Sequence, residues 1–237
     1  MSKTGLEDFF KTIDYRFSNE DLLQNALTHS SYANDKGLVY TKNNERLEFL
    51  GDAVLELVSS RFIFDENPNM VEGEMTTLRA SLVCEQSLAE AARGIKLDEQ
   101  VILGHGEEKT GGRKRDSILS DAFEALIGAI YLDGGYDEAE KFIKKYILTD
   151  IENKSLYHDS KSRLQEIVQG YFHEKTNIVY DVIDETGPAH EKIFTIALSI
   201  QGKSFTEAKG HTKKKAEQEA AYRALLMLKG KDLMSFL

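Results

Sequence analysis

The sequence predicts a mainly α-helical domain followed by a small α+β domain. Up to about residue 150, apolar residues recur at spacings of three and four, and no long alternating strand is present. After residue 160, helical periodicity gives way to three short segments rich in β-branched and aromatic residues, and then returns. We therefore expect a helical domain at 1–150, a polar linker at 151–159 and an α-β-β-β-α domain at 160–229.

The helical domain is predicted from periodic stretches separated by turn residues. The clearest periodic stretches are Leu47–Val58 and Ile118–Ile130. Clusters of Gly, Pro, Asn and Asp indicate the turns between helices; they fall at 65–69, 93–94, 104–106 and 133–135. These signals predict several helices packed around one core.

The C-terminal elements follow a simple order. Asp159 or Ser160 can cap a helix, because short polar side chains accept hydrogen bonds from the first free backbone N–H groups. The expected elements are a helix at Lys161–Phe172, strands at Asn177–Ile183, Lys192–Ile200 and Lys203–Ala208, and a helix at Thr212–Leu228. In a domain of this size, one sheet packed on two helices is the economical arrangement.

Charge is distributed unevenly along the chain. The net charge is −10, which alone would disfavour a nucleic-acid partner. From His158 onward, however, 12 basic residues face 11 acidic ones, and five lysines lie between Lys203 and Lys215. An acidic front and a locally basic back predict two domains with different roles.

The remaining composition limits location and cofactors. The N-terminus lacks the apolar run of a signal peptide, and no stretch approaches the ~20 apolar residues that span a bilayer. The single cysteine, Cys84, excludes an internal disulfide and a cysteine-rich zinc site. We expect a soluble, cytoplasmic protein without a membrane partner. The glycine-containing segments at 104–106 and 106–113 lack the features of dinucleotide and P-loop sites, so we expect no nucleotide cofactor.

Two groups of acidic residues are the most informative chemical signal. On a helix, Glu45, Glu48 and Asp52 fall at i, i+3 and i+7 and therefore share one face, although like charges repel at such spacings. Asp121 and Glu124 are the only charges in the apolar stretch Ile118–Gly128. A carboxylate in a largely buried helix must be neutralised, paired or bound to a metal.

These acids have two interpretations. In the first, one acidic face is simply solvated, and Asp121 and Glu124 each find a basic partner. In the second, both groups bind one divalent cation. Oxygen ligands without clustered Cys or His favour Mg²⁺, with Mn²⁺ as a substitute, over zinc. Such an ion suits chemistry at phosphates.

At these residues the sequence resembles the ribonuclease III family. The stretch Glu45–Leu55 is similar to the family's signature, and Ser120–Gly128 is similar to its second motif. Segments at 28–32 and 72–75 also resemble family segments. The resemblance implies a ribonuclease III-like helical fold and a magnesium-dependent enzyme that cuts double-stranded RNA.

The resemblance assigns roles position by position. It makes Glu48, Asp52, Asp121 and Glu124 the metal ligands, with Asp52 and Glu124 also catalytic. Glu45 and Glu72 are also assigned to the catalytic site, because they match further acidic residues that line the cutting valley, although a loop glutamate such as Glu72 is usually just solvated. Phe49 matches an aromatic residue that enters a socket on the partner subunit, and its alternative role is ordinary core. A homodimer is therefore implied, and symmetry explains why, since a two-fold dimer presents one site to each strand of a duplex.

The C-terminal domain resembles the double-stranded RNA-binding domain. Three lysines open its last helix, where the helix dipole favours phosphate. In that family, the first helix and the loop after the first strand enter minor grooves, and the lysines contact phosphates between them. We assign groove contacts to Gln165, Glu166, Gln169 and His190, and phosphate contacts to Lys213, Lys214 and Lys215.

The implied reaction is hydrolysis of duplex RNA to 5′-phosphate and 3′-hydroxyl ends with a short 3′ overhang. Substrates implied by the family are precursors of ribosomal and transfer RNA and some messenger RNAs. One alternative is a protein that binds double-stranded RNA without cutting it, which would not need the acids. Another is a metal phosphohydrolase acting on small molecules, which would not need the RNA-binding domain. The basic cluster Arg113–Arg115 fits an RNA contact and a solvated surface equally well.

Overall fold

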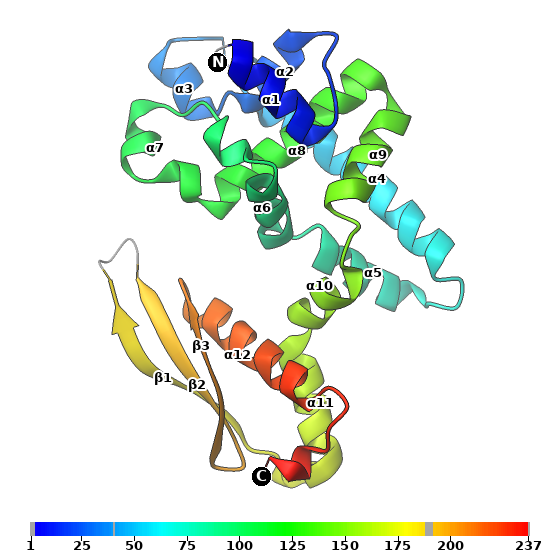
Figure 1. Cartoon of the computed structure of the whole chain (residues 1–237), viewed down its shortest axis with the longest axis vertical. Coiled ribbons are helices and arrows are strands. Elements are labelled where there is room, and N and C mark those ends of the chain that lie inside the picture. The colour runs from blue at the N-terminus through cyan, green and yellow to red at the C-terminus, as the bar shows by residue number, and fades with distance from the viewer. Residues whose placement is uncertain (1–2, 40, 188–191, 237) are drawn as a thin grey trace. The chain divides into compact units, whose positions relative to one another are not determined.

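The computed structural model describes residues 3–39, 41–187 and 192–236. The chain divides into two compact units, Met1–Ile151 and Glu152–Leu237, each with its own core (Figure 1). The first unit is helical and the second places three antiparallel strands between helices in chain order, as the sequence predicts. Within the described residues, no helix has both the length and the apolar character needed to cross a bilayer.

The first unit is built around α8 (Asp116–Gly134), whose residues from Ile118 to Ile130 are buried apart from two acids. It packs extensively against α4 (Glu45–Glu66), a helix of 22 residues. The other helices of the unit surround this pair: α1 (Lys3–Ile13), α2 (Glu20–Leu27), α3 (Ser30–Asp35), α5 (Glu72–Leu82), α6 (Glu85–Gly94), η1 (Leu97–Glu99), α7 (His105–Lys109), η2 (Gly112–Lys114) and α9 (Tyr136–Tyr146).

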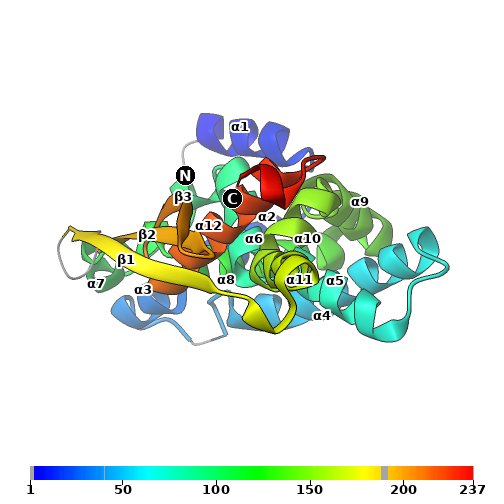
Figure 2. The ribbon, with the colours of Figure 1, turned by 90° about the horizontal axis from the view of Figure 1, so that it is seen from below.

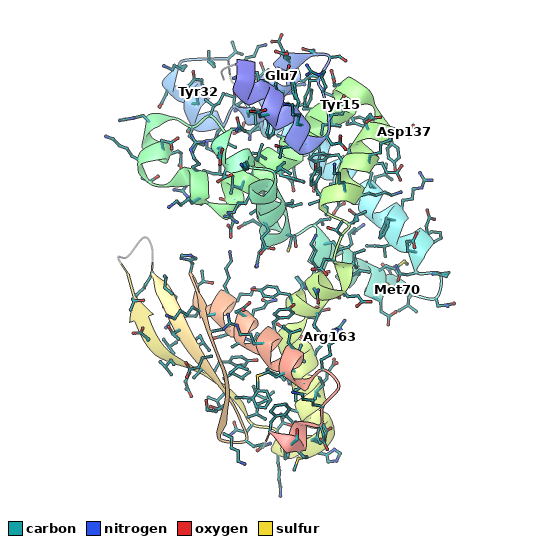
Figure 3. The ribbon with its side chains drawn as sticks, in the orientation of Figure 1. Glu7, Tyr15, Tyr32, Met70, Asp137 and Arg163 are labelled. Carbon is teal, nitrogen blue, oxygen red and sulfur yellow. The ribbon has the colours of Figure 1, made fainter. Side chains whose placement is uncertain are left out.

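The C-terminal end of α8 is fixed by the segment that follows α1. The Tyr15 hydroxyl, labelled in Figure 3, donates to Asp133 Oδ2 at 2.7 Å. The same carboxylate accepts from the backbone N–H groups of Ser18 and Asn19 at 2.9 and 2.8 Å. These bonds anchor the end of α8, which matters because α8 carries two of the candidate site residues.

The second unit packs one sheet on two helices. Its elements are α11 (Ser160–Phe172), η3 (His173–Lys175), β1 (Ile178–Thr186), β2 (Ile193–Ile200), β3 (Lys203–Gly210), α12 (Lys213–Leu228) and η4 (Leu233–Ser235). The strand order is β1-β2-β3, and both pairings are antiparallel. In Figure 2, α11 is seen almost end-on.

The core of the second unit lies between the sheet and both helices. Its alternating residues Ile196, Leu198 and Ile200 come from β2, as expected from the period of two. Leu164 and Val168 of α11 and a set of alanines on α12 complete it. Small residues on α12 let that helix lie close to the strands.

The predicted linker is helical. Residues Ile151–His158 form α10 rather than a coil. The stretch is polar, but it contains neither Gly nor Pro, so nothing in it opposes a helix. Two contacts with α12 fix its end: the rings of Tyr157 and Tyr222 meet at 5.3 Å, and Gln218 Nε2 donates to Tyr157 O at 2.9 Å.

Candidate functional site

The crossing of α4 and α8 positions the candidate acids. At Gly51 an added Cβ would stand 1.8 Å from the backbone oxygen of Glu124, and at Gly128 it would stand 2.3 Å from that of Leu47. The two helix backbones therefore touch at two glycines, an approach that any larger residue would prevent. Glu48 and Asp52 flank Gly51 on α4, and Glu124 lies one turn before Gly128 on α8.

This approach brings acids from both helices into one electrostatic group. The pKa of Glu124 is raised to about 8, first by burial and then by the carboxylates of Asp52, Glu48 and Asp121. Burial also raises the pKa of Glu48, and Asp121 is the largest of the like charges acting on it. Acids 69 to 76 residues apart in sequence thus repel one another in the fold, as the shared-cation interpretation requires.

The donor set fits a hard divalent ion. Glu48, Asp121 and Glu124 are half-buried, and Asp52 is exposed beside them. Burial and the three neighbouring carboxylates all raise the pKa of Glu124, and no basic side chain in the described part of the chain counters this shift, as the solvated-face interpretation would require. Among the residues that the structure describes, no three His, Cys, Asp or Glu side chains already lie in a geometry that would hold a metal ion. Binding would therefore require these side chains to rotate toward a shared point.

Of the other predicted acids, Glu45 lies close to the group and Glu72 does not contribute to it. Glu45 is exposed at the first position of α4 and raises the pKa of Glu48. Glu72 is exposed at the first position of α5 and lines a separate pocket of about 490 Å³. The pocket's other lining residues are Leu57, Ser60, Arg61, Ile63, Phe64, Met75, Thr76 and Arg79.

Phe49 is not part of the core of its own chain. It lies on α4 between the candidate ligands Glu48 and Asp52, and its side chain is 81% exposed. Leu57 and Phe64, further along α4, are also exposed and line the pocket described above. An apolar knob and an apolar hollow thus occur on one helix, which is typical of a protein interface.

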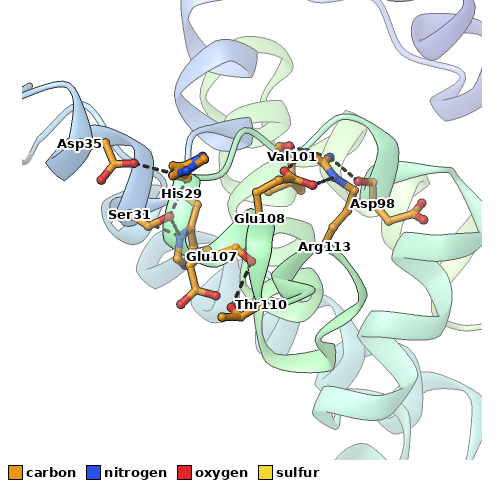
Figure 4. Close-up of polar contacts among 11 residues, drawn as sticks. His29, Ser31, Asp35, Asp98, Val101, Glu107, Glu108, Thr110 and Arg113 are labelled. Atoms are coloured by element: carbon orange, nitrogen blue, oxygen red, sulfur yellow. Dashed lines mark hydrogen bonds and ion pairs between the residues drawn. The ribbon is translucent and has the colours of Figure 1, made fainter. Parts of the chain in front are cut away.

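A histidine in one of the family-like segments lies near Asp121. His29 Nδ1 is 2.7 Å from the Ser31 hydroxyl and accepts from the Ser31 N–H at 3.2 Å, while the hydroxyl also accepts from Gly104 N–H (Figure 4). Burial raises the pKa of Asp121, whereas hydrogen bonding from Ser120 and the charge of His29 lower it. No spacing rule could have found this electrostatic interaction between His29 and Asp121, because it depends on how the segment before α3 lies relative to α8.

Arg113 of the basic cluster has an internal role. Its guanidinium donates to the backbone oxygens of Asp98 and Val101 at 2.7 and 2.8 Å, and to the carboxylate of Glu108 (Figure 4). Arg115 pairs with Glu107 at 2.9 Å. Arg113 therefore fixes the segment between η1 and α8, and the RNA-contact interpretation of this cluster loses one of its three basic residues.

The predicted RNA contacts of the second unit lie at its surface. Gln165, Glu166 and Gln169 are exposed on α11, and the two glutamines line a polar pocket with Lys161 and Tyr180. The lysines Lys213, Lys214 and Lys215 form the first turn of α12, where the N-cap Thr212 hydroxyl accepts from Lys215 N–H at 3.1 Å. His190 lies outside the described residues.

Comparison with known proteins agrees with both units. Residues 19–151 match the family model "Ribonuclease-III-like", and residues 160–228 match "Double-stranded RNA binding motif". Ribonuclease 3 of Staphylococcus epidermidis is 47% identical over 226 residues, covering 94% of this chain and 91% of the relative. Ribonuclease 3 of Staphylococcus aureus is 48% identical over 219 residues, covering 92% of this chain and 89% of the relative.

Solved structures agree for the first unit. The nuclease domain of ribonuclease III from Campylobacter jejuni matches with a TM-score of 0.56 and 40% identity, covering 62% of this chain and 95% of that one. A second structure of that domain, described as flexible in a region involved in dimer formation, has a TM-score of 0.55. The match covers 60% of this chain and 99% of that one. The chain therefore belongs to the ribonuclease III family and is a double-stranded RNA-specific endoribonuclease, with a helical nuclease domain followed by an RNA-binding domain.

Proposed function

We propose that the acids at the crossing of α4 and α8 are the catalytic centre and that they hold Mg²⁺, or Mn²⁺ in its place. The observation that supports this most directly is the raised pKa of Glu124, to about 8, under the influence of burial and three neighbouring carboxylates. A half-buried group of like charges is costly unless a cation neutralises it. Glu48 and Asp52 would hold the ion from α4, and Asp121 and Glu124 would hold it from α8.

The chain's own residues then have separate tasks. A bound Mg²⁺ supplies an activated water and offsets the charge that develops on the phosphate oxygens. Asp52 is the most accessible of the four acids, so it faces the incoming RNA backbone. The backbone at Glu124 is held in place by the packing of α8, whose surrounding residues are buried. The products expected from this hydrolysis are 5′-phosphate and 3′-hydroxyl ends with a short 3′ overhang.

The protein acts as a homodimer in this proposal. The exposed ring of Phe49 is the knob, and the pocket lined by Leu57, Phe64 and Met75 is the socket on a second copy. Glu72 lines the same pocket. Insertion of Phe49 would therefore bring Glu72 of one copy near the acids that flank Phe49 on the other. This gives Glu72 a reason to belong to the cutting valley although it stands apart within one chain.

The RNA-binding domain contributes affinity. Gln165, Glu166, Gln169 and His190 are assigned to groove contacts, and the lysines of α12 to phosphates, because the start of a helix favours negative charge. The cellular substrates proposed are precursors of ribosomal and transfer RNA and some messenger RNAs, and the single cysteine keeps the cytoplasm as the expected location.

The deciding experiment incubates the purified full chain with long double-stranded RNA, in Mg²⁺ and in a chelator. We expect short duplex products in Mg²⁺ and intact RNA in the chelator. Glu124→Ala should bind the duplex with wild-type affinity but cleave it very slowly, whereas Glu56→Ala, at an exposed position of the same helix α4, should cleave normally. Intact RNA in both wild-type reactions would favour the alternative, a protein that binds duplex RNA without cutting. Equal loss of binding and cleavage would make Glu124 structural.

A further inference from the structure

One of the α12 lysines shares a carboxylate with a lysine on the sheet. Glu185 near the end of β1 forms ion pairs with Lys192, which precedes β2, and with Lys213, at an N–O distance of 3.5 Å. Both ammonium groups also lie over the ring of Phe194, at 5.4 and 5.5 Å from its centre. Two cations, one anion and one aromatic face therefore form a single cluster, which we call the Glu185 cluster.

The sheet register explains why these residues meet. Glu185 pairs with Phe194 across β1 and β2, and Phe194 pairs with Gly210 across β2 and β3. At Gly210 an added Cβ would stand 2.6 Å from Ala216 N, so the first turn of α12 lies directly against the end of β3. This approach carries Lys213 to the ring of Phe194 and to the carboxylate opposite it.

The Glu185 cluster lies where RNA phosphates are expected. It contains one of the three lysines proposed to contact phosphate, and it joins the two strands that flank residues 187–191. The carboxylate is charged at neutral pH, since hydrogen bonding from Lys192 holds its pKa below the usual value. An anion at this position repels a phosphate and at the same time occupies the lysines that would bind it.

We propose that Glu185 is a specificity-determining residue that makes RNA binding depend on duplex geometry. The inference rests on the proposed RNA-binding role of the α12 lysines. Glu185 occupies Lys192 and Lys213, and a phosphate must replace it at both. An A-form duplex presents phosphates at fixed positions and can replace it in one binding step. A flexible single strand must first be ordered so that its phosphates reach the same positions. It therefore gains less binding free energy each time a phosphate replaces Glu185 at a lysine.

The test is the variant Glu185→Gln in the full chain, with Glu207→Gln as the control. Glu207 is an exposed acid on β3 of the same unit, so the control makes the same change in net charge. Affinities are measured in a chelator for a duplex of about 20 base pairs, longer than the ~16 that such a domain spans, and for a single strand of equal length.

We expect Glu185→Gln to bind the single strand about two- to five-fold more tightly, the range of an exposed ion pair, and to change duplex affinity less. The ratio of the two affinities should fall, while the control leaves it unchanged. The salt dependence for the single strand should steepen by roughly 0.7 for each lysine released. In a background carrying Lys192→Gln and Lys213→Gln, the change at 185 should have no further effect.

Three outcomes separate the possibilities. An unchanged affinity ratio, or weaker duplex binding with no gain for the single strand, would overturn the role of Glu185. A gain that persists without Lys192 and Lys213 would reduce it to a general charge effect and also overturn it. If the wild type itself binds no duplex, the proposed RNA-binding function has failed instead. Thermal melting of each variant checks that the fold is retained.

Discussion

Gly51 of α4 and Gly128 of α8 allow each helix to touch the backbone of the other: a Cβ at the first would stand 1.8 Å from Glu124 O, and at the second 2.3 Å from Leu47 O. The contact is reciprocal, so neither helix can be moved aside without separating the acids that flank the glycines. Site geometry and core packing are therefore coupled at this crossing.

Gly51→Ala should lower both stability and activity. The added methyl group overlaps a backbone oxygen, which cannot rotate away as a side chain would, so we expect a loss of about 3 kcal/mol in the free energy of unfolding. Cleavage should fall with it at temperatures where the variant is still folded. The control is Gly94→Ala at the end of α6, where a Cβ meets nothing within 4 Å and the stability change should stay below about 1 kcal/mol. Urea unfolding measures the free energy of unfolding of both variants. An equal loss in Gly51→Ala and Gly94→Ala would contradict the role of the helix crossing.

Stability without metal should fall as pH rises toward 8. Glu124 has a folded-state pKa of about 8, against 4.5 as its usual value. The folded protein therefore keeps a proton that the unfolded chain has released, so this stabilisation is complete below pH 4.5 and disappears as pH rises through 8. Melting temperatures are measured in a chelator at about pH 6 and about pH 8.5. Between these two pH values the melting temperature should fall less for Glu124→Gln than for wild type or for Glu56→Gln. An equal fall in all three proteins would refute the role of Glu124 in this pH dependence.

Added Mg²⁺ should stabilise the wild type most at the higher pH, because the ion replaces the proton on the carboxyl group. In Glu124→Gln this dependence on pH should weaken, since the titrating ligand is gone. Melting temperatures with and without Mg²⁺, at the same two pH values, check this. A metal effect independent of pH in wild type would mean that the ion binds elsewhere.

Phe49→Ala should produce a monomer with normal stability. The ring is 81% exposed within the chain, so its removal costs little folding energy, but both copies lose their knob in a two-fold dimer. We expect dimer affinity to fall by about a hundred-fold or more and cleavage to fall with it. Leu132→Ala, at an apolar side chain on α8 that is 54% exposed, is the control. Sedimentation equilibrium measures the dimer affinity of both variants. An intact Phe49→Ala dimer would place the interface on another surface.

Arg113→Ala should destabilise the nuclease domain without affecting RNA binding. The variant leaves the backbone oxygens of Asp98 and Val101 without their donor and removes the pair with Glu108, at a cost of about 2 kcal/mol. Lys114→Ala, at the exposed neighbour, should leave stability unchanged. A drop in duplex affinity for Arg113→Ala, under conditions where the variant is fully folded, would restore an RNA contact to this cluster.

Replacing Lys213, Lys214 and Lys215 by Gln should weaken duplex binding and flatten its salt dependence. The slope should decrease by about 0.9 or less for each lysine that no longer meets a phosphate. Cleavage at saturating enzyme should persist, since the acids are untouched. The matched control replaces the exposed lysines Lys203, Lys209 and Lys229 of the same unit. If both triple variants lose the same duplex affinity and salt dependence, the effect comes from net charge and not from the position of the lysines in the first turn of α12.

Local patterns in the sequence are sufficient to predict the two fold classes and which acids share a helix face. The alternation in β2 and the apolar stretch around Asp121 and Glu124 correspond to buried elements in the structure. The helix α10 is not predicted, because its polar composition is also typical of a coil and its end is fixed by contacts with α12. Sequence alone does not decide the exposure of Phe49, since an apolar residue beside a core position looks the same in either role.

Other features depend on tertiary contacts that no local pattern encodes. The internal role of Arg113 requires two backbone oxygens that come together only in the folded domain. The ion pairs of Glu185 require the register of two strands and the position of α12. Residue type indicates the chemistry in both cases, but not the partner.

The meeting of Gly51 and Gly128 also has a consequence during protein synthesis. A nascent chain that ends before Gly128 contains Glu48 and Asp52 but not the complete helix that carries the other two acids. Such a fragment cannot gather all four acids, so the ribosome presents no assembled centre until α8 has been made. The order of translation thus delays the nuclease until its first domain can close around both helices.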